Sequence, residues 1–116
     1  MKIGFSASIT ADSVDVAVLA QKGEELGYDS FWIGEQPVFP VTSSTTPPYG
    51  SSPDFMAHMV DAFISLARVS GITKQLKLGT AICLIPEQNP SFLLKKLLPW
   101  ITSPAAGSYS VSERAG

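Results

Sequence analysis

The first third of the chain changes from an alternating pattern to a helical one. Residues 2–9 alternate apolar with small polar side chains, which predicts a short strand. An apolar stripe at helical spacing follows, and it predicts a helix over about 13–26 with Asp12 or Ser13 as its N-cap. Gly27 then occupies a position that favours a left-handed C-terminal cap.

The rest of the pattern repeats this strand and helix pair twice. Residues 31–33 and 77–85 are continuous apolar runs, which are typical of parallel strands covered on both faces. Helical spacing returns from Asp54 or Asp61 to Gly71, and again from Asn89-Pro90 until Pro99 ends it. Alternating strands and helices predict an α/β fold with right-handed crossovers, either the start of a doubly wound sheet or the start of a (β/α)8 barrel.

One segment, residues 37–53, interrupts this order. It holds five prolines and an unbroken Ser/Thr run at 42–46, so no regular structure is expected there. A linker is one interpretation. Because both flanks continue the same repeating unit, we favour a long strand-to-helix loop.

Composition narrows the function classes. The chain has 116 residues, with 8 Lys+Arg against 10 Asp+Glu and a net charge of −2, so a nucleic-acid or anionic-membrane partner is not expected. Cys83 is expected to be a buried, inert thiol, and no Cys/His spacing predicts a metal site. Neither a signal peptide nor a membrane-spanning run is present, so a cytoplasmic protein is expected. No GxGxxG motif follows the first strand, and there is no P-loop.

Two segments resemble one known family. Residues 23–35, GEELGYDSFWIGE, closely resemble the EELGYDSLWIGEH segment of luciferase-like monooxygenases. Residues 78–86, LGTAICLIP, with Asn89-Pro90 after them, are similar to a second segment of that family. With the proline-rich loop, the likeness is nearest to probable coenzyme F-420-dependent oxidoreductases, and it covers about residues 1–95.

The resemblance implies a TIM-like (β/α)8 barrel in which FMN or coenzyme F-420 lies at the C-terminal ends of the strands. Active sites of such barrels lie at that face in general. Carried over residue by residue, the expected cofactor contacts come from the first and third strands: Ser6, Ala7, Thr80, Ala81 and Ile82. The family also has a non-prolyl cis peptide bond, which would fall between Ala81 and Ile82.

The resemblance also implies catalytic positions after the second strand. Glu35 and Gln36 match positions where the family carries an acidic residue followed by His. An amide cannot titrate, so Gln36 does not support acid–base catalysis, and Glu35 remains a candidate beside the alternative of a capping or solvated carboxylate. His58, the one histidine, is expected to be exposed or structural.

After Lys95 the resemblance ends, and the tail from Lys96 to Gly116 has a second interpretation. When each codon is started one base earlier, Trp100 (TGG) followed by Ile101 (ATH) forces GAT, which encodes Asp. The shifted codons permit Leu-Asp-His-Leu-Ser-Gly-Gly-Arg-Leu and then Gly-Val-Gly-Ala-Gly, close to the family's continuation. We therefore expect that one nucleotide was lost near the codons of Lys95 and Lys96. The alternative is a divergent C-terminus.

These patterns predict two regions: the N-terminal part of a luciferase-like barrel at 1–98, with about three of the eight βα units, and an unstructured, out-of-frame tail at 99–116. The function implied is hydride transfer by a flavin- or deazaflavin-dependent oxidoreductase acting on a small organic substrate, with homo-oligomers expected of intact relatives. A truncated, inactive chain is the first alternative. A stand-alone interaction module that uses the proline-rich loop is the second.

Overall fold

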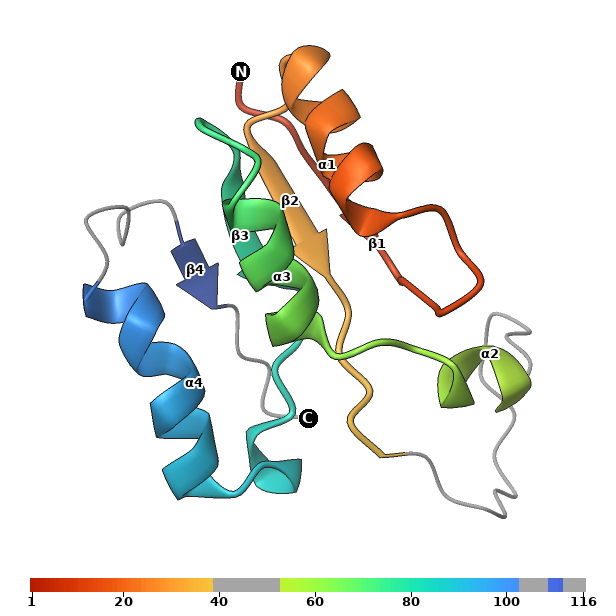
Figure 1. The fold of residues 1–116 in the computed structure, drawn as a ribbon, viewed down its shortest axis with the longest axis vertical. Helices are drawn as coiled ribbons and strands as arrows, with labels where there is room; N and C mark the ends of the chain where they lie inside the picture. Colours follow the sequence, from red (N-terminus) through yellow and green to blue (C-terminus); the bar gives the residue numbers. More distant parts are fainter. Residues whose placement is uncertain (39–52, 103–108, 112–116) are drawn as a thin grey trace.

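Four parallel strands form a single sheet in the computed structural model, which describes residues 1–38, 53–102 and 109–111 (Figure 1). The strands are β1 Gly4–Ala7, β2 Ser30–Ile33, β3 Lys77–Thr80 and β4 Tyr109–Val111, and they lie in the order β1-β2-β3-β4. Each strand therefore pairs with the next strand along the chain, in parallel. Among the described strands the order lacks the reversal of a doubly wound sheet and agrees with successive units of a barrel.

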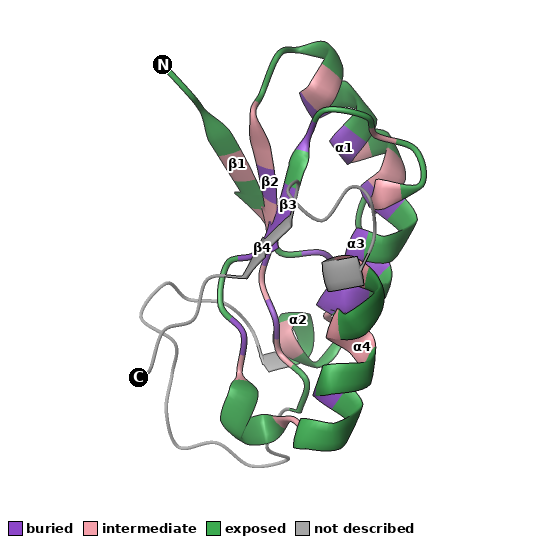
Figure 2. Cartoon of the chain, turned by 90° about the vertical axis from the view of Figure 1, so that its left-hand side faces the viewer, coloured by how far each residue is buried: buried purple, intermediate pink, exposed green. Residues whose placement is uncertain are grey.

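The helices connect these strands on one side of the sheet. The chain runs through α1 Val16–Glu25, α3 Ala62–Ser70 and α4 Pro90–Thr102, with the short helix α2 Pro53–Ala57 placed away from the sheet. In Figure 2, α1, α3 and α4 stand on the same side of the strands, while no described helix lies on the other side. The sheet thus has one covered face and one uncovered face.

The core lies between the covered face and the helices. Phe31 and Ile33 of β2 are fully buried, and Ala20 of α1 and Val69 of α3 are equally inaccessible. Leu78 of β3 belongs to the same cluster. Since side chains alternate along a strand, the residues between these positions point to the uncovered face.

The helix termini confirm several sequence expectations and correct one. Gly27 has a φ of 84°, the left-handed conformation expected of the residue after α1. Asp61 caps α3 by accepting a hydrogen bond from the Ile64 amide at 2.9 Å. The N-cap of α1 is Asp15, which accepts from the Ala17 amide at 2.8 Å, and not Asp12 or Ser13.

The α1 cap moves because Ser13 has another partner. Its hydroxyl donates to the Thr10 carbonyl at 2.8 Å, and this local turn uses the side chain before the helix begins. Asp15 is then the next residue with an oxygen in capping position.

The third strand is shorter than the apolar run predicted. The ladder ends at Thr80, although the run continues to Ile85. The Ala81 amide still donates to the Ile33 carbonyl at 2.9 Å, after which the chain leaves the sheet and forms a 3₁₀ turn at Ile85–Glu87. Length of an apolar run alone cannot show where a buried strand gives way to a buried turn.

The C-terminal region differs from the expected unstructured tail in two places. The helix α4 continues past Pro99 to Thr102, so the proline lies inside the helix and does not end it, although it removes one backbone hydrogen-bond donor. Tyr109–Val111 forms β4, which takes the free hydrogen-bonding edge of β3. The other residues of 99–116, and positions 39–52 of the predicted long loop, lie outside the described part of the chain.

Candidate functional site

The C-terminal ends of β1, β2 and β3 meet at one edge of the sheet. The Gly34 amide donates to the Ala7 carbonyl at 3.3 Å, and the Ala81 amide donates to the Ile33 carbonyl. These bonds extend the strand ladder by one residue on β2 and β3. All seven site residues predicted from the sequence therefore lie at or directly beyond this edge.

The five predicted cofactor contacts lie in two different environments. Ser6, Ala81 and Ile82 are exposed, and Ser6 points to the uncovered face. Ala7 is packed against the core, and Thr80 is 1% exposed on the covered face. Three of the five side chains are thus accessible at the edge, while Ala7 and Thr80 lie on the covered side of the sheet.

Thr80 has a second distinctive property. Within the described part of the chain its hydroxyl oxygen has no hydrogen-bond partner. A buried hydroxyl without a partner is costly, so threonine at this position is not explained by packing alone.

The peptide bond expected to be cis is not cis here. The described residues contain no cis peptide bond, and this includes Ala81–Ile82. A trans bond is favoured by about 3 kcal/mol at a non-prolyl position, and both residues are exposed.

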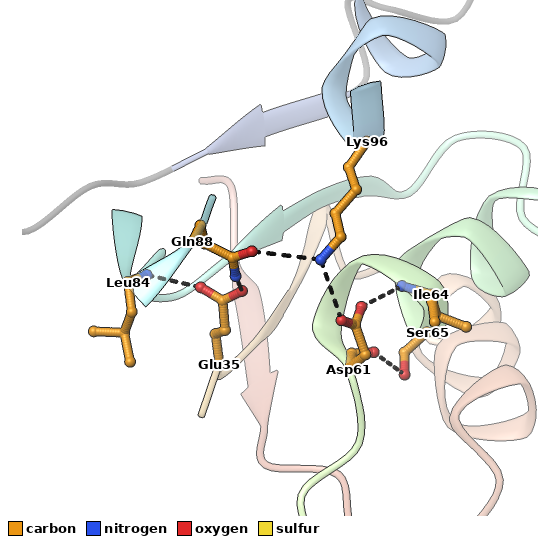
Figure 3. Close-up of polar contacts among 7 residues, drawn as sticks. All are labelled: Glu35, Asp61, Ile64, Ser65, Leu84, Gln88 and Lys96. Atoms are coloured by element: carbon orange, nitrogen blue, oxygen red, sulfur yellow. Dashed lines mark hydrogen bonds and ion pairs between the residues drawn. The ribbon is translucent and has the colours of Figure 1, made fainter. Parts of the chain in front are cut away.

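Glu35 is buried directly after β2 and uses both of its carboxylate oxygens (Figure 3). It is 9% exposed. Its Oε2 accepts from the Leu84 amide at 2.7 Å, and its Oε1 accepts from the Gln88 side-chain amide at 2.6 Å. The carboxylate is therefore neither solvated nor a helix cap, and it joins the end of β2 to the segment that follows β3.

The contacts of Glu35 continue into a longer polar chain. The Gln88 oxygen accepts from Lys96 Nζ of α4 at 3.4 Å, and the same ammonium lies 3.6 Å from Asp61 Oδ2 at the start of α3. Lys96 also stands over the ring of Phe63, with Nζ 5.7 Å from the ring centroid. Sequence reasoning missed Gln88, Lys96 and Asp61 as neighbours of the site, because no spacing signal connects residues 35, 61, 88 and 96.

Gln36 and His58 serve local structure. The Gln36 side-chain amide donates to the Val38 carbonyl at 2.8 Å, which shapes the exit from β2. His58 has a 61% exposed side chain, as expected, and its Nδ1 lies 3.9 Å from Asp12 Oδ2. Neither residue contacts Glu35 in the interactions that the structure shows.

Much of the sequence motif that carries the family resemblance lies at the opposite end of the sheet. Glu24 Oε1 accepts from three consecutive backbone amides at 2.9, 2.5 and 2.9 Å, those of Lys74, Gln75 and Leu76. Burial opposes ionisation of this carboxyl, but the three amides outweigh burial and hold the pKa of Glu24 below its usual value. The sequence indicated only that Glu24 lies near the end of a helix.

Other residues of the motif have similar structural roles. Asp29 accepts from the Ile3 amide at 2.8 Å, and Tyr28 packs on Phe5 with ring centroids 5.0 Å apart. The motif 23–35 therefore combines a structural region at the N-terminal ends of the strands with one polar residue, Glu35, at the other end.

A cavity beside the end of β1 is separate from the predicted site. It has a volume of about 380 Å³ and lies between the residues after β1 and α3, with the Asp15–Arg68 ion pair among its lining residues. None of the predicted site residues lines it. No group of three or more His, Cys, Asp or Glu side chains suited to a metal ion occurs in the described residues.

The exposed part of the edge carries small side chains at Ser6 and Ala81, whereas both oxygens of Glu35 are already bound by N–H groups. The carboxylate of Glu35 therefore fixes the segment beside the edge and is not an open acid–base group. None of the helices described is long and apolar enough to cross a membrane.

Comparison with known proteins shows the family of this chain. No match was found among curated proteins or among solved structures. A family model described as luciferase-like monooxygenase matches residues 3–98, which include β1 to β3 and all seven predicted site residues. The chain therefore belongs to the luciferase-like monooxygenase family.

Proposed function

We propose that this chain carries the cofactor-facing strand ends of a flavin- or deazaflavin-dependent oxidoreductase that transfers hydride to or from a small organic substrate. Coenzyme F-420 is the preferred cofactor, on the likeness of the two sequence segments to F-420-dependent members, and FMN is the alternative. The bound cofactor would supply the hydride chemistry, and the protein would supply orientation and exclusion of water.

One observation carries the proposal. The exposed residues Ser6 of β1 and Ala81 and Ile82, which follow β3, lie at the C-terminal edge of a parallel sheet, where barrels of this class bind their ligands. In this proposal those three residues contact the ring system. Ala7 and Thr80 support these positions from the covered face, where the Thr80 hydroxyl has no hydrogen-bond partner among the described residues.

Glu35 and Gln36 have supporting roles in the same proposal. Glu35 holds the segment after β3 through the Leu84 amide and the Gln88 side chain. Gln36 shapes the exit of β2 through Val38. Proton transfer through Gln36 is excluded by its chemistry, since an amide does not titrate at physiological pH.

Direct titration tests the proposal. Purified protein is titrated with FMN and, separately, with reduced F-420, and binding is followed by absorbance and fluorescence. We expect saturable one-to-one binding of one of them and no binding of NADP⁺, for which the chain has no GxGxxG motif. Absence of saturable binding for both FMN and F-420 would contradict the proposal.

A second candidate is an inactive chain produced by a lost nucleotide. It is favoured by one observation, the agreement between the shifted codons of the tail and the family's continuation. Sequencing of the genomic DNA tests this candidate. An overlapping reading frame that encodes Leu-Asp-His-Leu-Ser-Gly-Gly-Arg-Leu and then further predicted strands supports the loss of a nucleotide. A reading frame without such a continuation contradicts it. Insertion of one base near codon 95 is then expected to yield a product that binds the cofactor more tightly than the present chain.

A further inference from the structure

The polar chain at the site depends on one residue that both donates and accepts. Glu35 and Asp61 carry carboxylates, which only accept hydrogen bonds, and Lys96 carries an ammonium, which only donates. Gln88 lies between Glu35 and Lys96. Its nitrogen is directed at Glu35, with 2.6 Å between the heavy atoms, and its oxygen is directed at Lys96 at 3.4 Å.

This orientation of the Gln88 amide is the only one compatible with its partners. If the amide were turned over, its oxygen would face a carboxylate and its NH₂ group would face an ammonium. Glu35 and Lys96 therefore set the direction of the Gln88 amide together, and the Gln88 amide satisfies the oxygen of Glu35 that the Leu84 amide leaves free.

These polar contacts connect four elements of the fold (Figure 3). They begin at Asp61, the N-cap of α3, cross α4 at Lys96 and the 3₁₀ turn at Gln88, and end at Glu35 after β2. The segment that they hold, Leu84 to Gln88, follows two residues after Ile82. The position of the exposed pair Ala81–Ile82 thus depends on where these polar contacts hold the backbone of residues 84–88.

We propose that Gln88 and Lys96 are positioning residues for the cofactor edge, acting through Glu35 on the backbone after β3. This proposal rests on the proposed function for the identity of the ligand. The series of contacts from Lys96 through Gln88 to Glu35, which we call the relay, does not depend on that identity. Glu35 is nine-tenths buried, so the amide of Gln88 and the amide of Leu84 replace water as its donors. Lys96 is half-exposed and contributes direction rather than strength.

The test exchanges the side chains of residues 35 and 88. In Glu35→Gln, the new side-chain NH₂ group faces the NH₂ group of Gln88. In Gln88→Glu, the new carboxylate faces the carboxylate of Glu35. In the double variant Glu35→Gln/Gln88→Glu every contact is complementary again: the new amide accepts from Leu84 and donates to the new carboxylate, which pairs with Lys96. We expect the Leu84 amide to exchange with solvent at least about tenfold faster in each single variant. In the double variant its rate is expected to return to within about threefold of the wild type.

Two references separate this relay from a general loss of stability. The Phe31 amide of β2 reports global opening, and its exchange rate is expected to stay unchanged in all variants. Lys96→Met is expected to accelerate Leu84 exchange severalfold, whereas Lys95→Met, at the neighbouring exposed lysine, is expected to leave it unchanged. Additive effects of the two single variants, or equal effects of the two lysine variants, would overturn the proposal.

Cofactor affinity is the second readout. If the wild-type chain binds FMN or F-420, the dissociation constant is expected to rise in both single variants and to recover in the exchanged double variant. A dissociation constant that is unaffected by Gln88→Glu would overturn the positioning role. If the wild type binds neither ligand, the proposed function fails, while the exchange of Leu84 still decides whether the relay exists.

Discussion

A single carboxylate, Glu24, joins the end of α1 to the segment that enters β3. It accepts hydrogen bonds from the backbone amides of Lys74, Gln75 and Leu76. Its neighbour Glu25 instead forms an exposed ion pair with Lys22. Hydrogen bonds to a charged acceptor are stronger than neutral ones, and the three donors have no other acceptor among the contacts shown. The two adjacent glutamates are therefore expected to contribute very differently to the stability of the fold.

Substitution of these two glutamates measures the difference. We expect Glu24→Ala to lower the free energy of unfolding by about 2 kcal/mol, because three amides lose a charged acceptor. Glu25→Ala is the matched control and is expected to change it by less than about 0.5 kcal/mol, as for other exposed ion pairs. Urea unfolding followed by circular dichroism gives both values. Equal effects of the two variants would show that the three hydrogen bonds of Glu24 do not stabilise the fold.

The same residue predicts a pH dependence. The pKa of Glu24 is lowered in the folded state, so its contribution is fully present above the pKa of the unfolded chain, about 4.3, and is lost as the pH falls through the lower folded value. The difference in stability between wild type and Glu24→Gln is therefore expected to be constant from pH 7 to 5 and to shrink below pH 4. A difference that grows on acidification would contradict the sign of this shift. Urea titrations at several pH values provide the comparison.

At the scale of elements, α1 packs on β1 through a glycine. A Cβ atom at Gly23 would overlap the ring of Phe5, and that ring stacks on Phe31 with centroids 4.6 Å apart. Helix propensity favours alanine over glycine by about 1 kcal/mol, so a glycine in the middle of a helix needs a packing reason. Close approach of the helix to the Phe5 ring is that reason.

Alanine scanning of two glycines tests the close approach. Gly23→Ala is expected to destabilise the fold by about 1 kcal/mol or more despite its better propensity, since overpacking costs about 1–3 kcal/mol. Gly71→Ala is the control, because a Cβ there would make ordinary contact, 3.5 Å from the Arg68 carbonyl oxygen, and it is expected to change stability by less than about 0.5 kcal/mol. Thermal unfolding reports both. Phe5→Leu in the Gly23→Ala background is expected to recover part of the loss, and an unrelieved loss would place the strain elsewhere.

The elements also show how far the sequence could be interpreted. The apolar runs predicted β1, β2 and the start of β3, and Gly27 and Asn89 were recognised as terminal residues because their chemistry is local. The cap at Asp15, the end of β3 at Thr80 and the continuation of α4 past Pro99 were not predicted. Each of these depends on a contact or on cooperativity beyond the few residues that a local pattern samples.

At the scale of the whole molecule, the two sides of the sheet differ in whether they can accommodate a larger side chain. Ser6 is exposed on the uncovered face, whereas Ala20 of α1 packs in the core on the covered side and is fully inaccessible. Both residues are small, but only Ala20 is enclosed by the core. A large side chain thus has room at one position and not at the other.

The same substitution at both positions separates binding from folding. Ser6→Lys is expected to change the free energy of unfolding by less than about 0.5 kcal/mol while weakening FMN or F-420 binding at least about tenfold. Ala20→Lys is expected to prevent cooperative folding, because an unpaired charge would be buried. Denaturant unfolding and ligand titration on the same samples distinguish the two effects. Unchanged affinity in Ser6→Lys would remove Ser6 from the proposed cofactor edge.

The sequence by itself determined the family, the order of strands and helices, and the residues that gather at the C-terminal edge of the sheet. These follow from periodicity and from short motifs, which are local properties. Only the tertiary structure decided which face each residue occupies: it buried Thr80, exposed Ala81 and Ile82, and connected Glu35 to Gln88, Lys96 and Asp61. The reason is that the contacts of Glu35 with Leu84 and Gln88 join residues 49 and 53 positions apart, and that exposure after Thr80 depends on the exact end of a strand. Neither is encoded in spacing along the chain.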